Sequence, residues 1–86
     1  MLNLSKHLKD YTSCANPKLN LYLNMLHTHG EVQIVTTTGA VHTTHLGDWG
    51  EVTDGYFAYR TKEGEVNVIF PDQIQSLNTH RGYQEA

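Results

Sequence analysis

Aromatic side chains next to turn-forming residues are the groups in this sequence best suited to recognition chemistry. Trp49 lies in the segment 47–50 between two glycines, and Tyr56 follows the turn-forming pair Asp54-Gly55. Aromatic rings on loops bind unpaired bases by stacking, and this mode tolerates most base sequences. A lone tryptophan in a small domain also commonly folds back to cap the hydrophobic core. Both interpretations of Trp49 stay open at this point.

Polar residues near these rings could contact other parts of the same ligand. Arg60 and Lys62 lie near the end of a predicted strand, where they could bind phosphates. Asp72 and Gln73 could bind base edges as acceptor and donor. The alternatives are ordinary solvated charges for the two cations, and a role for Asp72 in stabilising the turn after Pro71.

The histidines form two close pairs, which raises the question of a metal site. His27 and His29 are two positions apart, and His42 and His45 are three apart. Alternation along a strand sends His42 and His45 to opposite faces, and no cysteine pair accompanies them. We therefore expect no metal and no other cofactor. The sequence also lacks a nucleophile motif and a glycine-rich phosphate loop, so we do not expect an enzyme.

Length and composition limit the class of protein further. The 86 residues allow one domain, and the single cysteine, Cys14, excludes an internal disulfide. Six Lys and Arg against nine Asp and Glu give a formal charge of −3, which argues against coating nucleic acid by bulk charge. No apolar run reaches the ~18–20 residues of a membrane span. We expect a cytoplasmic protein, in the host cytoplasm if it is viral.

Two kinds of periodicity divide the chain near residue 30. Asn16-Pro17 predicts a helix start and Gly30 its end, with apolar residues at helical spacing between them. The alternation from Leu19 to Met25 leaves a strand as the alternative. From Glu31 onward the period is two, and the turn residues separate five predicted strands, at 31–37, 40–46, 56–60, 65–70 and 74–77.

These elements predict a mainly β fold in which an N-terminal α-helix is followed by a five-stranded, strongly bent antiparallel sheet. Gly47 and Gly50 mark a bulge or bend after the second strand. Short strands joined by tight turns and bent by glycine favour a small open barrel over a flat sheet.

The region 17–77 resembles the Sm/LSm family, which includes the bacterial Sm-like RNA chaperones. The positions of this chain that match the family motifs are, in chain order, Gly30, Val32, Ile34, Gly39, Asp54, Tyr56, the strand 66–70, the loop 71–73, Ile74 and Leu77. Two positions differ from the family. Phe70-Pro71-Asp72 stands where other members have Arg-Gly or Lys-His, and Ala58 stands where an asparagine is expected.

The resemblance implies a divergent, phage-type or cellular Sm-like open barrel (SH3-like) that forms rings and binds single-stranded RNA or DNA. It implies an N-terminal extension at 1–15, an Sm-like domain at 16–79 and a C-terminal tail at 80–86. The residues expected to bind nucleic acid are Trp49, Asp54, Tyr56, Arg60, Lys62, Phe70, Asp72 and Gln73.

Self-association also has a physical argument that does not depend on the family. An open barrel leaves two strand edges with unpaired main-chain groups, and the predicted strand at 65–70 carries few charges to block pairing. Head-to-tail pairing of this strand with the fifth strand of a neighbour closes a ring when the rotation allows. The alternative function is a small β-barrel interaction or assembly module, such as a viral accessory protein, without nucleic-acid binding.

Overall fold

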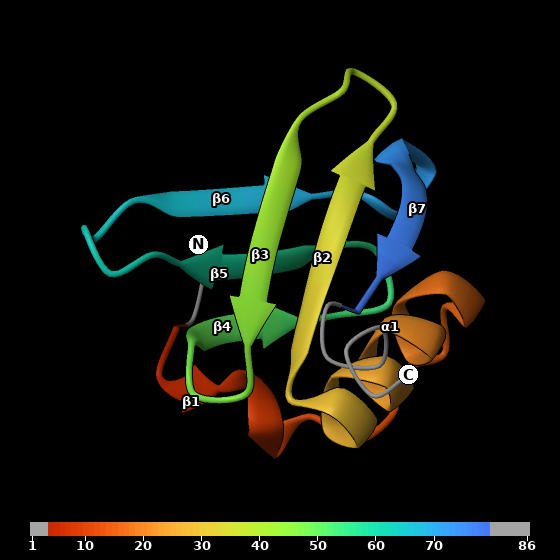
Figure 1. Cartoon of the computed structure of the whole chain (residues 1–86). Coiled ribbons are helices and arrows are strands. Elements are labelled where there is room, and N and C mark those ends of the chain that lie inside the picture. Colours follow the sequence, from red (N-terminus) through yellow and green to blue (C-terminus); the bar gives the residue numbers. More distant parts are fainter. Residues whose placement is uncertain (1–3, 80–86) are drawn as a thin grey trace.

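One helix and two antiparallel sheets make up the computed structural model, which describes residues 4–79 (Figure 1). The predicted tail at 80–86 and the start of the predicted extension lie outside the described residues. The elements in chain order are β1 (Lys6–His7), the 3-10 helix η1 (Leu8–Asp10), α1 (Pro17–His29), β2 (Glu31–Thr36), β3 (Val41–His45), β4 (Trp49–Val52), β5 (Phe57–Arg60), β6 (Val66–Ile69), the 3-10 helix η2 (Pro71–Gln73) and β7 (Ile74–Asn78).

Helix α1 begins and ends at the residues that the sequence predicts. The Asn16 side chain accepts hydrogen bonds from the backbone N–H groups of Lys18 and Leu19, and proline occupies the first turn. At the other end Gly30 adopts a left-handed φ of +82° and donates to the carbonyl of Leu26. The helix prediction is confirmed, and the alternative of a strand at Leu19–Met25 is wrong.

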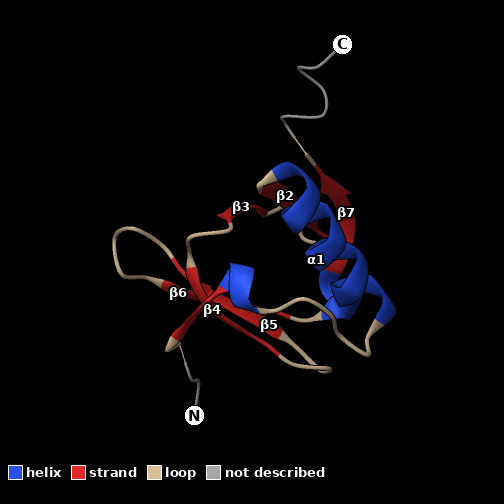
Figure 2. Ribbon diagram, turned by 90° about the horizontal axis from the view of Figure 1, so that it is seen from below, coloured by secondary structure: helices blue, strands red, loops and turns tan. Residues whose placement is uncertain are grey.

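The strands form two sheets that lie in separate layers, with α1 beside them (Figure 2). Sheet A has the order β1-β4-β5-β6, and sheet B has the order β3-β2-β7. The core between them is apolar and includes one face of α1. Its buried residues are Leu8, Leu19, Tyr22, Leu23, Leu26, Val32, Ile34, Phe57, Tyr59, Ile69 and Ile74.

The prediction of a single five-stranded bent sheet is only partly correct. The segment after His45 is a separate strand, β4, which joins sheet A while β3 stays in sheet B. The chain passes from sheet B to sheet A between β3 and β4 because the main chain of Leu46–Asp48 bonds to the N-terminal segment and not to β2. Leu8 N–H donates to the Asp48 carbonyl at 2.8 Å, and Lys9 N–H donates to the Leu46 carbonyl at 3.1 Å. The glycine bend was correctly placed, but the strand that follows it was missed.

The helix is also not the first element, because an N-terminal strap (residues Lys6–Ala15) precedes it along the edge of sheet A. Leu8 in this strap is fully buried in the common core. The Tyr11 hydroxyl donates to the Gly50 carbonyl at 3.2 Å, and Ala15 N–H donates to the Asp54 carboxylate at 3.2 Å. The strap contains the short helical turn η1, and it is firmly attached, since Leu8 fills core space and β1 makes strand hydrogen bonds to β4.

Glycine at position 50 is required by the strap. A Cβ built there would collide with the Leu8 side chain and lie 2.7 Å from the Ala58 carbonyl oxygen. Glycine therefore lets Leu8 pack directly against the main chain of β4, as close backbone approach generally demands.

Candidate nucleic-acid interface

The two faces of sheet A have opposite character because side chains alternate along each strand. Gly50 pairs with Tyr59, and Val52 pairs with Phe57, and both aromatic rings of these pairs are buried in the core. The intervening positions therefore point away from the core. We call this opposite side the outer face of sheet A. Its side chains are Trp49, Glu51, Ala58, Arg60, Val66 and Val68, with Tyr56 and Phe70 at the ends of their strands.

Trp49 lies on this outer face and is not a member of the core cluster. Its side chain remains 37% exposed. The imidazole of His7 stacks on the indole, with ring centroids 3.9 Å apart and planes inclined by 28°. The guanidinium carbon of Arg60 lies 6.0 Å from the indole centroid. The structure thus brings together two of the sequence-predicted residues, Trp49 and Arg60, and adds His7 as a third.

A second aromatic pair lies at the other end of the outer face. The rings of Tyr56 and Phe70 meet edge to face with centroids 6.5 Å apart. The Tyr56 hydroxyl donates to the Glu51 carboxylate at 3.1 Å, and this hydrogen bond raises the pKa of Tyr56. Phe70 is 49% exposed. Tyr56 and Phe70, both predicted to bind bases, are therefore neighbours with accessible ring surface.

The remaining predicted site residues lie elsewhere. Asp54 accepts from the N-terminal strap, and the Gln73 side-chain oxygen accepts from Phe70 N–H at 3.3 Å. Asp72 is exposed in η2. Lys62 lines a separate cavity of about 190 Å³ whose wall includes the core-facing Tyr59. Asp54 and Gln73 thus have structural partners, and Lys62 is not grouped with Arg60.

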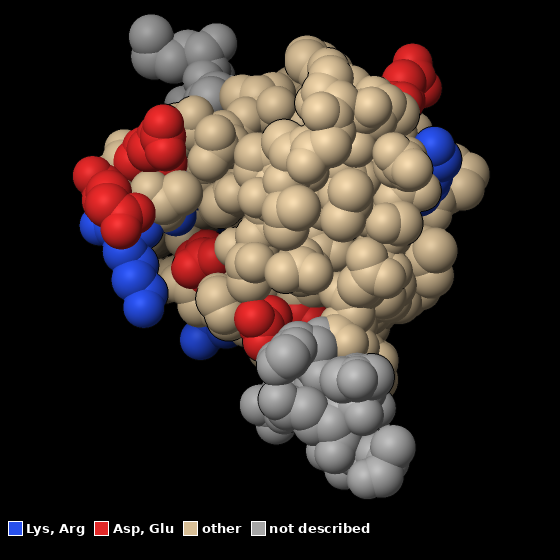
Figure 3. Space-filling view, turned by 45° about the horizontal axis from the view of Figure 1, so that its top comes forward, with Lys and Arg blue, Asp and Glu red and all other residues tan. Residues whose placement is uncertain are grey.

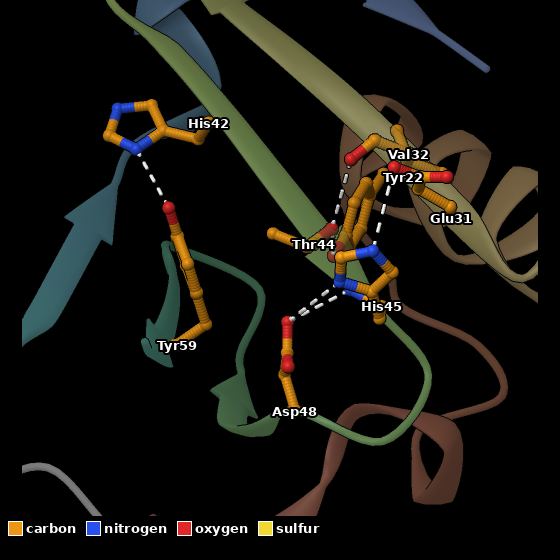
Figure 4. A network of polar contacts seen from close by, with 8 residues as sticks. All are labelled: Tyr22, Glu31, Val32, His42, Thr44, His45, Asp48 and Tyr59. Carbon is orange, nitrogen blue, oxygen red and sulfur yellow. Dashed lines mark hydrogen bonds and ion pairs between the residues drawn. The ribbon is translucent and has the colours of Figure 1, made fainter. Parts of the chain in front are cut away.

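His42 and His45 make separate contacts, as Figure 4 shows. His42 Nδ1 lies 2.9 Å from the Tyr59 hydroxyl, which joins β3 of sheet B to β5 of sheet A. Burial raises the pKa of Tyr59. The ring of His45 lies between two carboxylates, 3.5 Å from Glu31 and 3.7 Å from Asp48. Within residues 4–79, no three histidine, cysteine or acidic side chains are grouped so that they could hold a metal ion.

A buried hydrogen-bond chain fixes α1 to sheet B, and it is drawn in the same view (Figure 4). Thr44 Oγ1 donates to the Val32 carbonyl at 3.2 Å and lies 2.6 Å from the Tyr22 hydroxyl, which must then be the donor. Both side chains are fully buried, and burial raises the pKa of Tyr22 well above its usual value of 10.0. Among the described residues, no buried side-chain nitrogen or oxygen lacks a hydrogen-bond partner.

His7 is the functional candidate that sequence reasoning missed. It belongs to a strand of only two residues, and so short a segment carries no recognisable alternation. A signal was nevertheless present, since Gly50 next to a solvent-facing tryptophan indicates close approach of another segment.

Charged side chains are unevenly distributed over the surface. No Lys, Arg, Asp or Glu occurs between Val32 and Gly47, the region of β2 and β3. Figure 3 shows a broad uncharged face with acidic and basic groups around its margin. The described part of the chain contains no helix with the length and apolar character needed to cross a membrane.

Comparison with known proteins adds no relative. No family model, curated protein or solved structure matches the chain. The assignment of function therefore depends on the geometry of the surface itself.

Proposed function

We propose that the protein is a ring-forming, Sm-like module that binds single-stranded nucleic acid and acts in RNA processing or regulation. RNA is the preferred ligand in this proposal. The observation that carries the proposal is the outer face of sheet A. There Tyr56 and Phe70 lie at one end, and Trp49 and Arg60 lie at the other. Exposed rings on a sheet are the usual platform for stacking unpaired bases.

The charge distribution favours stacking over phosphate contact as the main source of affinity. Arg60 is the one basic side chain among the strand positions of the outer face, and the formal net charge is −3. Each phosphate contact on a single strand contributes a slope of about −0.7 to the dependence of log K on log salt. With one or two such contacts, we expect the affinity to fall only gently as salt rises.

Ring formation is supported by the free edges of the two sheets. The predicted fourth and fifth strands are β6 and β7, and each forms one free edge of its sheet. Along β6 and just after it, three apolar side chains are exposed: Val66 by 41%, Val68 by 40% and Phe70 by 49%. An unblocked apolar edge strand pairs readily with another strand. Addition of β7 from a second copy leaves that copy's own β6 free, so pairing repeats until a ring closes.

A cavity beside β6 is available to the side chains of an added strand. Its volume is about 130 Å³, and it lies between this strand and the β2–β3 hairpin. Its lining residues are Thr36, Thr38, Ala40, His42, Val68, Ile69 and Gln73. The lining is mostly polar, which suits the exposed polar side chain of Gln75 on β7.

Binding of labelled oligouridylate and oligoadenylate tests the proposed function. We expect binding at low salt that Tyr56→Ala weakens strongly, because each stacked base contributes about 1–3 kcal/mol. Thr43→Ala, at an exposed position of sheet B, is the matched control and should leave binding unchanged. If neither RNA nor DNA binds at low salt, the proposed function is wrong.

Light scattering at micromolar concentration tests the ring. The wild-type protein should be a homo-oligomer, and Val68→Lys should make it a monomer because lysine blocks pairing at edge strands. Thr43→Lys places the same charge on an exposed position of sheet B and should leave the oligomer intact. A monomeric wild-type protein would contradict ring formation.

A second candidate is an assembly module that does not bind nucleic acid. The apolar edge of β6 and the acidic net charge favour it. The two experiments separate the candidates, because an oligomer that binds no oligonucleotide is the expected result for the assembly module alone.

A further inference from the structure

We propose that a nucleobase of single-stranded nucleic acid inserts between Trp49 and Arg60, and that the N-terminal strap supports this base-stacking site by holding His7 against the indole. The inference rests on the proposed function and assigns a position to one base. It places that base over β4 and β5, the two central strands of sheet A.

Strand register places Trp49 between the other two side chains. His7 of β1 pairs directly with Trp49 of β4. On the other side, Gly50 of β4 pairs with Tyr59 of β5. Because the strands are antiparallel, Trp49 lies opposite Arg60. His7, Trp49 and Arg60 therefore form one row across three strands, and the indole has a neighbour on each side.

The His7 side of the indole is already filled. The centroid separation of 3.9 Å is a full stacking contact. His7 is held in place because the next residue, Leu8, is fully buried and donates its N–H to the Asp48 carbonyl at 2.8 Å. The indole is thus oriented before any ligand arrives, which reduces the entropy lost on binding.

The Arg60 side is loosely filled. The guanidinium carbon is 6.0 Å from the indole centroid, well beyond the His7 distance. Because stacked bases are spaced by about 3.4 Å, a base between the two groups needs a separation of about 7 Å. Arg60 is an exposed residue on a flexible side chain, so an outward movement of about 1 Å is sufficient. Its planar guanidinium can then stack on the second face of the base.

The chemistry of the two walls selects a neutral planar ligand. An indole and a guanidinium both offer flat surfaces to a ring placed between them. A lysine or methylated ammonium group would be attracted by the indole but repelled by the positive charge of Arg60. A nucleobase has no such conflict, and its phosphate remains within reach of the guanidinium.

Trp49 fluorescence provides a direct test, because the chain has a single tryptophan. Oligoadenylate should quench the emission as a base stacks on the indole. In a parallel anisotropy assay, Trp49→Leu should weaken binding roughly 5- to 150-fold, the range for loss of one stacked base. His7→Ala should weaken it less, and His7→Phe, which restores a stacking ring, should recover affinity. His29→Ala, at the end of α1, is the control and should change nothing.

The outcomes separate this inference from the proposed function. Quenching together with loss of affinity in Trp49→Leu supports both. Binding that depends on Tyr56 but leaves Trp49 emission and the Trp49→Leu affinity unchanged overturns the inference and leaves the proposed function standing. Absence of any oligonucleotide binding overturns both. Urea denaturation of each variant establishes that a loss of affinity does not come from unfolding.

Discussion

The outer faces of the two sheets differ more than their core-facing sides do. Sheet B presents Gln33 opposite Thr43 and Val35 opposite Val41, with no aromatic ring and no charge at these positions, and at one end Glu31 lies opposite His45. Sheet A presents the row of His7, Trp49 and Arg60 instead. Both sheets bury apolar residues toward the common core, so the core-facing pattern does not distinguish them. Outward-facing side chains therefore identify the surface suited to a ligand.

The sheets also differ in what completes them. Sheet A needs the N-terminal strap, whose Leu8 fills the core and whose β1 covers the edge of β4. Sheet B is joined to α1 through the buried hydroxyl groups of Tyr22 and Thr44. The connection of sheet A to the strap is apolar, whereas the connection of sheet B to α1 is a chain of hydrogen bonds. Substitutions in each should therefore differ in size and in pH dependence.

The largest effect is expected at Leu8. Leu8→Ala removes a fully buried side chain and should lower the free energy of unfolding by about 2–5 kcal/mol in urea denaturation. Leu21→Ala is the matched control, because Leu21 is 53% exposed on α1 and its loss should change stability by roughly 0.5 kcal/mol or less. Equal stability of the two variants would show that the strap is not part of the core of sheet A.

A smaller loss is expected for Gly50→Ala. The added Cβ would collide with Leu8 and approach the Ala58 carbonyl, and overpacking of this kind costs about 1–3 kcal/mol. Part of this cost should vanish in the Leu8→Ala background, because the collision partner is then smaller. A double-mutant cycle measures the coupling. Strict additivity of the two substitutions would contradict the close packing of strap and strand.

Much of the fold was predictable because local signals and packing agree there. The capping Asn16 and the terminating Gly30 set the limits of α1, and alternation placed the five predicted strands within a few residues. The extra strands β1 and β4 were missed because their existence depends on each other. Lys6 and His7 become a strand only by pairing with Gly50 and Trp49, which is a long-range contact that periodicity does not encode.

The candidate site was predictable to a similar extent. Trp49, Tyr56, Arg60 and Phe70 could be selected by residue type and by their positions near turns, and all of them lie on one face. Asp54 was selected on the same grounds, yet its carboxylate binds the backbone of the strap. Residue type indicates which side chains can bind a ligand. Tertiary packing decides which of them already bond to another part of the protein.

Sheet B should respond most strongly to loss of a buried hydroxyl. Thr44→Val removes the acceptor of the Tyr22 hydroxyl and one donor to the Val32 carbonyl, so the buried Tyr22 hydroxyl loses its partner. We expect a loss of about 1–3 kcal/mol, whereas Tyr22→Phe, which keeps the Thr44 bond to Val32, should cost about 1 kcal/mol. Urea denaturation at neutral pH measures both. The reverse order of these two losses would contradict the direction of the hydrogen-bond chain.

The smallest effect is an alkaline loss of stability, and it tests the two sheets against each other. Burial raises the pKa of Tyr22, next to sheet B, and of Tyr59, in sheet A, above the usual tyrosine value of 10.0. Above pH 10 the unfolded chain loses these protons while the folded chain retains them. The free energy of unfolding therefore falls as pH rises, by at most about 1.4 kcal/mol per pH unit for each tyrosine. Between pH 9 and 10.5 the loss should remain below about 1 kcal/mol for each residue.

Comparison of two variants assigns this alkaline loss. Tyr22→Phe should flatten the decline of the unfolding free energy above pH 10 more than Tyr59→Phe does, because Tyr22 is fully buried and Tyr59 is 4% exposed and bonded to His42. Tyr56→Phe provides a comparison at an accessible ring, whose pKa is raised by the hydrogen bond to Glu51 and not mainly by burial. Urea titrations at a series of pH values give the slopes. The contrary outcome is a pH dependence of the unfolding free energy that none of the three variants alters. It would show that α1 and sheet B separate before Tyr22 ionises, and that the bond between Tyr22 and Thr44 does not contribute to cooperative unfolding.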